Sequence, residues 1–161
     1  MIKFYKVTEE QYLKDALGNI NGNDPKTIYD DIKIPMRATK GSAGYDIYSP
    51  IDFKLAPKEN IKLPLGIKAE MDPNVVLLMI PRSSLGFKYK FQLDNVVGVI
   101  DSDYINSDNE GHIWVKFTNN GDKEIDVKKG TAICQGIFVN YLTTDDDSVN
   151  AIRNGGIGST G

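Results

Sequence analysis

The chain has 161 residues, of which 40% are hydrophobic and 25% charged, and this allows a single domain with a buried core. Its net charge is −3 and it has no large basic cluster, which argues against a nucleic-acid polymer as partner. No apolar run approaches the roughly 18 residues of a membrane helix, and the single cysteine, Cys134, cannot form an internal disulfide. We therefore expect a cytoplasmic protein that does not contact a membrane.

Residues 1–32 form an N-terminal extension in which one short helix is predicted. Thr8 is followed three residues later by Gln11, the spacing of a capping box, and apolar residues then recur on one face until the next glycine. The helix should span about residues 9–17. The Asn, Gly, Asp and Pro content of residues 19–25 predicts a turn or loose linker after it.

Residues 33–142 have the pattern of an all-β domain. Short apolar or alternating runs are separated by Pro, Gly, Asn and Asp, among them YDIYS, IKLPLGIKAEM, VVLLMIP, HIWVKFT and AICQGIFVNYL. This pattern is typical of a sandwich or barrel. Residues 143–161 then form a polar linker and an arm that ends in RNGGIGSTG. Its glycines predict a flexible arm, and their N–H groups are open to a closely approaching anion.

Two internal stretches combine residue types that suit phosphate or acid–base chemistry. PRSSLG places an arginine beside two hydroxyl side chains after an apolar strand, which suits charge-assisted contacts to phosphate oxygens. GVIDSDYIN places Asp101 and Asp103 at an expected hairpin bend. A calcium loop does not fit there, because Asn106 stands where that loop needs glycine and His112 where it needs glutamate. Read alone, either stretch is also compatible with an ordinary turn.

Five segments resemble, in this order, the motifs of the trimeric deoxyuridine triphosphatases (dUTPases): AGYDIYS (43–49), PRSSLG (81–86), GVIDSDY (98–104), KGTAICQ (129–135) and RNGGIGSTG (153–161). The resemblance implies a jelly-roll β-barrel that assembles as a homotrimer with active sites shared between subunits. It implies hydrolysis of dUTP to dUMP and pyrophosphate, which keeps uracil out of DNA and supplies dUMP for thymidylate synthesis.

The resemblance also implies roles for residues of the third motif. Asp101 would be the general base that draws a proton from the water attacking the α-phosphate. Tyr104 would lie under the deoxyribose and leave no room for a 2′-hydroxyl. Backbone groups of a hairpin from Gly98 to about Val115 would read the uracil edge. They include those of Val99, Ile100 and Trp114, and Asn95 would hold the hairpin and contribute to the pocket.

The phosphates would be held by the other motifs. The resemblance assigns this role to Arg82, Ser83, Ser84 and Gln135, and to an arm that closes over a neighbouring site with Arg153, Ile157, Gly158, Ser159 and Thr160. Mg²⁺ would bridge the phosphates and neutralise charge as the leaving group departs. Asp46 would act through water bound to this ion, and a purely structural role for it stays open.

The sequence departs from the family pattern at three places. Isoleucine stands at position 157, where the family usually has a phenylalanine that stacks on uracil, and we rank Tyr89 ahead of Phe87 and Phe91 as its replacement. An insertion of about five residues precedes Gly111. The N-terminal helix is an addition without a catalytic residue, and we expect it to pack outside the barrel.

Two alternatives stay open at this point. The dCTP deaminases share the fold and often carry Arg-Ser-Ser in the second motif, but Lys116 stands where their catalytic glutamate is expected. A regulatory binding protein of the same fold is the other alternative, and a regulatory protein partner is compatible with catalysis. The sole histidine, His112, has no metal-ligand companions in the sequence, and Asp145–Asp147 suit a solvated linker.

Overall fold

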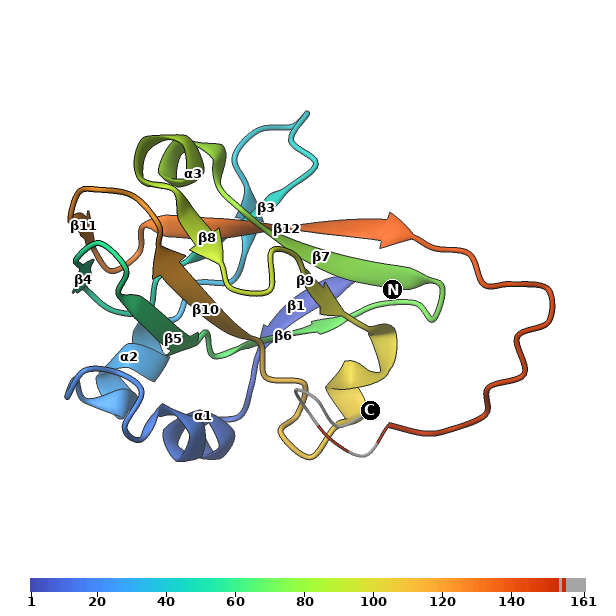
Figure 1. The fold of residues 1–161 in the computed structure, drawn as a ribbon. Coiled ribbons are helices and arrows are strands. Elements are labelled where there is room, and N and C mark those ends of the chain that lie inside the picture. Colours follow the sequence, from blue (N-terminus) through green and yellow to red (C-terminus); the bar gives the residue numbers. More distant parts are fainter. Residues whose placement is uncertain (154, 156–161) are drawn as a thin grey trace.

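The computed structural model describes residues 1–153 and residue 155, and its described part is built mainly from short strands (Figure 1). The strands form a five-stranded sheet, a three-stranded sheet and two strand pairs. This agrees with the all-β class predicted from the sequence. No helix in this part of the protein is long and apolar enough to cross a membrane.

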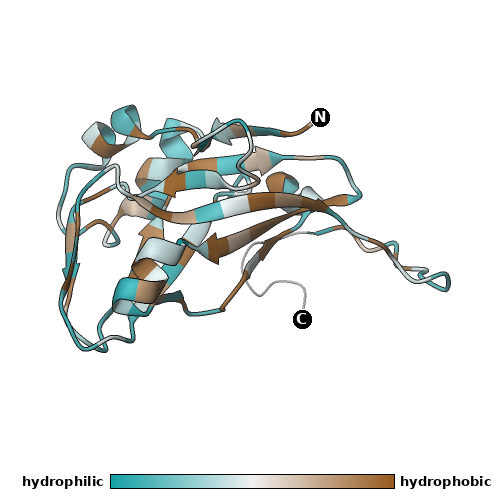
Figure 2. Cartoon of the chain, turned by 90° about the horizontal axis from the view of Figure 1, so that it is seen from above, coloured by the Kyte–Doolittle hydropathy of each residue, from teal (hydrophilic) through white to brown (hydrophobic). Residues whose placement is uncertain are grey.

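The five-stranded sheet is the largest layer. Its order is β2-β3-β12-β7-β9, with β2 at Met36–Arg37, β3 at Tyr45–Tyr48, β12 at Ala132–Asn140, β7 at Val75–Pro81 and β9 at Gly98–Ile100. All its neighbouring strands pair antiparallel, and β12 and β7 form its long centre. Figure 2 shows hydrophobic residues along the long central strands, as expected for strands that face a core.

A second sheet packs against the first across the core. Its order is β5-β10-β8, with β5 at Asn60–Pro64, β10 at Trp114–Asn119 and β8 at Phe91–Leu93. Phe91 and Phe117 from paired strands stack with ring centroids 4.3 Å apart, and both are fully buried. Two strand pairs complete the layers: β4 at Phe53–Leu55 with β11 at Ile125–Val127, and β1 at Lys3–Lys6 with β6 at Ile67–Glu70.

The N-terminal extension contains two helices. The first, α1 at Glu9–Ala16, begins as the capping box predicts, because the Thr8 hydroxyl accepts a hydrogen bond from the Gln11 N–H. The second, α2 at Pro25–Asp31, was not predicted. Asp24 caps it and Pro25 stands at its first turn, a signal that the turn-like composition around it obscured. Buried residues of β1, of both helices and of the link between β1 and α1 belong to the same hydrophobic cluster as the barrel: Phe4, Val7, Tyr12, Ala16 and Ile28.

The hairpin expected from Gly98 to Val115 is not formed. β9 pairs with β7, whereas β10 pairs with β5 and β8 in the other sheet. Between them lie a 3-10 helix, η1 at Ser102–Asn106, and an irregular loop. This connection is too long for a tight turn, so each strand joins the sheet that buries its own apolar face. A short helix, α3 at Ser83–Tyr89, follows β7.

Candidate active site

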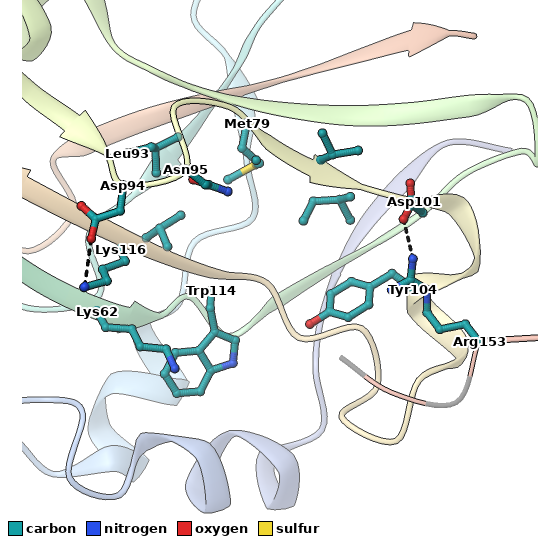
Figure 3. Close-up of a pocket in the computed structure, with 14 residues that line it drawn as sticks. Lys62, Met79, Leu93, Asp94, Asn95, Asp101, Tyr104, Trp114, Lys116 and Arg153 are labelled. Carbon is teal, nitrogen blue, oxygen red and sulfur yellow. Dashed lines mark hydrogen bonds and ion pairs between the residues drawn. The ribbon is translucent and has the colours of Figure 1, made fainter. Parts of the chain in front are cut away.

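A pocket of about 500 Å³ lies between β9 and β10 (Figure 3). It collects eight of the residues predicted to bind substrate, although they come from four separate parts of the sequence: Asn95, Gly98, Val99, Ile100, Asp101, Tyr104, Trp114 and Arg153. Met79 and Leu93 add apolar lining from the core side. The pocket is therefore the region in which most of the third motif converges.

The two strands beside the pocket each present an open edge. β9 is the edge strand of its sheet and pairs only with β7 within the residues that the structure describes. β8 pairs with β10 from Phe117 onward, so Trp114 and Val115 have β5 on one side and the pocket on the other. Strand edges carry rows of N–H and C=O groups. The pocket thus offers backbone donors and acceptors on two sides to a flat polar group.

One end of the pocket is closed by acidic residues and an arginine. Asp101 directly follows β9, and its side chain remains 49% exposed. The Arg153 guanidinium donates to the carboxylates of Asp101 and Asp103, and its Nε lies 2.9 Å from Asp103 Oδ1. It also lies over the Tyr104 ring, 5.7 Å from the centroid. Asp101 is thereby held at the pocket by an ion pair within its own subunit.

Tyr104 is fixed in orientation by its hydroxyl. This O–H donates to the His112 carbonyl at 2.9 Å and accepts from Asn109 Nδ2 at 2.9 Å. Burial raises the pKa of the Tyr104 phenol above its ordinary value, so the hydroxyl stays a donor at neutral pH. Because the hydroxyl is used within the protein, the ring is the part of Tyr104 that remains for a ligand.

The opposite end of the pocket carries charged residues that were not predicted to bind substrate. Lys116 Nζ lies 3.0 Å from Asp94 Oδ2, and Lys62 Nζ lies 4.6 Å from the centroid of the Trp114 ring (Figure 3). Lys62 reaches the pocket because β5 pairs with β10 and sets Lys62 opposite Lys116. That pairing joins residues far apart in sequence, and no local signal in the sequence indicated it.

The residues predicted to hold phosphates form a separate group. Arg82 Nε lies 3.5 Å from Asp46 Oδ1, and Asp46 stands opposite Gln135 where β3 pairs with β12. Gly44 leaves room for this arrangement, because a Cβ there would lie 2.3 Å from Gln135 Oε1. None of these residues lines the pocket, nor do Ser83 and Ser84 in the first turn of α3. Figure 1 shows α3 and η1 in well-separated parts of the fold.

The aromatic residues between the second and third motifs do not line the pocket. Phe91 is fully buried in the core, Tyr89 packs against that core, and Phe87 is 90% exposed on α3. Two aromatic rings do line the pocket, those of Tyr104 and Trp114. Four residues predicted to bind substrate through the arm lie outside the described residues: Ile157, Gly158, Ser159 and Thr160.

The described residues offer no ready-made cage for a metal ion. No group of three or more His, Cys, Asp or Glu residues that could hold one occurs in residues 1–153 and 155. Asp101 and Asp103 face Arg153, and Asp46 faces Arg82. Such a donor set fits Mg²⁺ only when most of its ligands are substrate oxygens and water, which is how this ion is often bound beside phosphates.

A family model for dUTPases matches residues 30–161. The chain belongs to the dUTPase family. A deoxyuridine 5′-triphosphate nucleotidohydrolase of Lactococcus lactis is 43% identical over 147 residues, covering 88% of this chain and 98% of the relative. One from Haemophilus influenzae is 34% identical over 142 residues, covering 83% of this chain and 91% of the relative.

Solved structures support the same family. The dUTPase from Streptococcus mutans matches with a TM-score of 0.67 and 30% identity, covering 89% of this chain and 98% of that one. The dUTPase from phage phi11 of S. aureus, solved as a D95N mutant with a structural Mg(II) ion, matches with a TM-score of 0.65. Its identity is 17%, so that likeness concerns the fold. The pocket between β9 and β10 thus lies in the fold of a dUTPase.

Proposed function

We propose that the protein hydrolyses dUTP to dUMP and pyrophosphate, which keeps uracil out of DNA and supplies dUMP for thymidylate synthesis. One observation carries the proposal in this protein. The pocket lies between the open edges of β9 and β10 and ends at Asp101 and Tyr104. Along the pocket, a gap that can hold a base is followed by the aromatic ring of Tyr104, which has the size of a sugar, and by the carboxylate of Asp101. This order matches the parts of a deoxynucleotide: base, deoxyribose and α-phosphate.

The uracil ring lies in the gap between the two strand edges. Its edge presents one N–H donor between two carbonyl acceptors, which backbone carbonyl and amide groups of Gly98–Ile100 and of Trp114 complement. Cytosine carries an amino donor and a ring acceptor instead, so a fixed pattern of backbone groups rejects it. The Trp114 ring covers the base and replaces the aromatic face that Ile157 lacks. The cation–π contact from Lys62 holds this ring in place.

The deoxyribose packs on the ring of Tyr104. Two hydrogen bonds hold that ring, so it does not move aside for a larger sugar. A 2′-hydroxyl on the ring side would meet an apolar surface without a partner, at a cost of about 1–3 kcal/mol for an unsatisfied hydroxyl. The protein therefore prefers deoxynucleotides over ribonucleotides.

Asp101 is the general base. Its carboxylate accepts a proton from a water that attacks the α-phosphorus in line, and the bond to the pyrophosphate leaving group breaks. The contact between Arg153 and Asp101 supports this role only as a resting arrangement, because a base must be free to take up a proton. Arg153 moves to the phosphates when dUTP binds, together with Ile157, Gly158, Ser159 and Thr160 of the arm.

The phosphates are held by a second subunit of a homotrimer. Arg82, Ser83, Ser84 and Gln135 do not line the pocket of their own subunit, which supports a site completed by another copy. When bound, Mg²⁺ would supply positive charge that offsets the charge on the leaving group. Asp46 contacts Arg82 and steadies it, and it would hold the ion only indirectly, through water. The site as a whole is shared between subunits.

The test is pyrophosphate release from dUTP, dCTP, dTTP and UTP by the protein and by Asp101→Asn. We expect strong preference for dUTP and a loss of turnover by orders of magnitude in the variant, with dUTP binding retained. Equal turnover of the four nucleotides, or ammonia release from dCTP, would contradict the proposal. Asp122→Asn, which changes an exposed carboxylate outside the pocket, is the matched control and should behave as the unaltered protein.

A further inference from the structure

The N-terminal helix α1 and the loop before Gly111 bind each other. At the start of α1, the Glu110 carboxylate accepts the Thr8 N–H at 3.0 Å and the Thr8 hydroxyl. At its end, Asp15 Oδ2 lies 2.6 Å from His112 Nδ1. Both ends of the helix are therefore attached to the loop that carries Tyr104, the residue on whose ring the deoxyribose packs (called the Tyr104 platform below).

His112 occupies a fully buried position with both ring nitrogens engaged. The backbone amide of Gly66 donates to Nε2 at 2.8 Å. A backbone amide can only donate, so Nε2 carries no proton. In the neutral ring the proton is therefore on Nδ1, where it donates to Asp15. The Gly66 amide thus fixes the tautomer of the imidazole, and Asp15 of the helix accepts from its Nδ1–H.

The orientation of His112 is passed on to Tyr104. The His112 carbonyl accepts the Tyr104 O–H, and Asn109 Nδ2 donates to the same hydroxyl oxygen of Tyr104. Asn109 Oδ1 accepts from Ser107 Oγ at 2.8 Å and from the Gly111 N–H at 3.1 Å. Gly111 has φ +72°, and a Cβ there would lie 2.6 Å from Ile105 Cα, so the loop packs tightly around the platform.

The charges around His112 favour this neutral arrangement. Burial lowers the pKa of the His112 imidazole, although Asp15 and, more weakly, Glu110 act in the opposite direction. Tyr12 from the same helix packs its ring 5.9 Å from the imidazole. Lys68 from β6 is paired with Glu110 at 2.8 Å. If the ring were protonated, Nε2 would carry a hydrogen that points at the N–H of Gly66, and the hydrogen bond between them would be lost.

We infer that Asp15 and His112 are positioning residues that hold the Tyr104 platform, so that the N-terminal helix contributes to the selection of deoxyribose over ribose. The inference rests on the proposed function, because that function makes the ring of Tyr104 the surface on which the deoxyribose packs. Neither residue lines the pocket, and both act through the backbone at position 112.

The first test is the tautomer itself. The protein has one histidine, so its imidazole ¹⁵N signals need no site assignment. We expect the Nδ1–H form at neutral pH, and in Asp15→Ala a shifted Nδ1 signal that reports the lost hydrogen bond to Asp15. An Nε2–H form in the unaltered protein would overturn the inference, whether or not dUTP is hydrolysed.

The second test compares dUTP with UTP as substrates. We expect Asp15→Ala to lower the ratio of their kcat/KM values about tenfold, because UTP is then turned over and the KM for dUTP rises. A misplacement of about 1 Å at such a site can cost up to about a hundredfold, so a smaller shift of Tyr104 is sufficient. Asp15→Asn keeps an oxygen that accepts from Nδ1 and should restore the ratio. Glu10→Ala, on the exposed side of α1, is the matched control.

The outcomes separate this inference from the proposed function. If the unaltered protein does not hydrolyse dUTP, the proposed function fails, while the tautomer still reports on the pair. If dUTP is hydrolysed and a folded Asp15→Ala variant keeps the wild-type ratio, the inference is wrong. If Asp15→Ala does not fold, the decision falls to Asp15→Asn, whose ratio must match wild type for the inference to hold.

Discussion

Glu110 offers a stability prediction whose size follows from its surroundings. Burial raises the pKa of its carboxyl, but hydrogen bonds from Lys68 and Thr8 outweigh that effect and lower the pKa from 4.5 to about 2. A group with a depressed folded pKa stabilises the protein above its unfolded pKa and loses this contribution as the pH falls. The stabilisation is therefore complete above about pH 4.5 and is lost towards pH 2.

The size of the effect is set by the shift in pKa. A difference of one unit corresponds to about 1.4 kcal/mol, so the shift of Glu110 amounts to at most about 3 kcal/mol. The side chain is 28% exposed, so solvent screening is moderate. Glu110→Gln keeps the shape and removes the charge. Its free energy of unfolding should fall less steeply between pH 4.5 and pH 2.5 than that of the unaltered protein, by up to this amount.

The assay is urea unfolding at a series of pH values, at one fixed protomer concentration because oligomers unfold in a concentration-dependent way. Glu124→Gln is the control, since Glu124 pairs with Lys54 at 3.6 Å and is 57% exposed. It should keep the wild-type slope. If Glu110→Gln also keeps that slope, the attachment of the loop to α1 through this carboxylate is refuted.

Three further predictions concern the site. Trp114→Ala should raise the KM for dUTP about tenfold or more, since stacking on a base contributes about 1–3 kcal/mol, while Phe87→Ala, at an exposed position outside the pocket, should not. Mixing inactive Asp101→Asn and Arg82→Ala subunits, with unfolding and refolding, should restore about a quarter of wild-type turnover if each trimer site takes these residues from different subunits; no recovery would indicate a site within one subunit. Truncation after Asn150 should leave a folded trimer by gel filtration but lower kcat by orders of magnitude, and near-normal turnover would dismiss closure by the arm.

The local signals in the sequence were sufficient for several elements. The capping-box spacing of Thr8 and Gln11 predicted α1 almost to its bounds, because a helix start is decided by neighbours in the sequence. The alternating runs predicted the strands for the same reason. The segment before α2 contains several Gly and Asn residues, and these outweighed the Asp24-Pro25 signal.

The contacts across sheets could not be predicted in the same way. Packing in the core determines that β9 pairs with β7 and that β10 pairs with β5. The expected hairpin from Gly98 to Val115 was therefore wrong. His112 was considered only as a candidate metal ligand, since its partner Asp15 lies 97 residues away in the sequence. Lys62 reaches the pocket through strand pairing as well, and Asp94 directly follows β8, which pairs with β10.

The sequence indicated which motif residues belong to one site, but it indicated less well which part of each residue faces the pocket. The resemblance assigned Asp101, Tyr104 and Trp114 to one site, and all three line one pocket in the structure. It assigned Trp114 a role for its backbone, whereas its ring also lines the pocket. The roles assigned to the individual residues stay predictions, and those of the arm concern residues outside the described part of the protein.

The central claim is that Asp101 directs a water molecule to the α-phosphorus of dUTP. A single-turnover reaction in ¹⁸O-labelled water tests it directly, with mass spectrometry of both products. We predict that the label is found in dUMP and that Asp101→Asn forms labelled dUMP far more slowly. Label in the pyrophosphate, or an unchanged rate in the variant, would contradict the account.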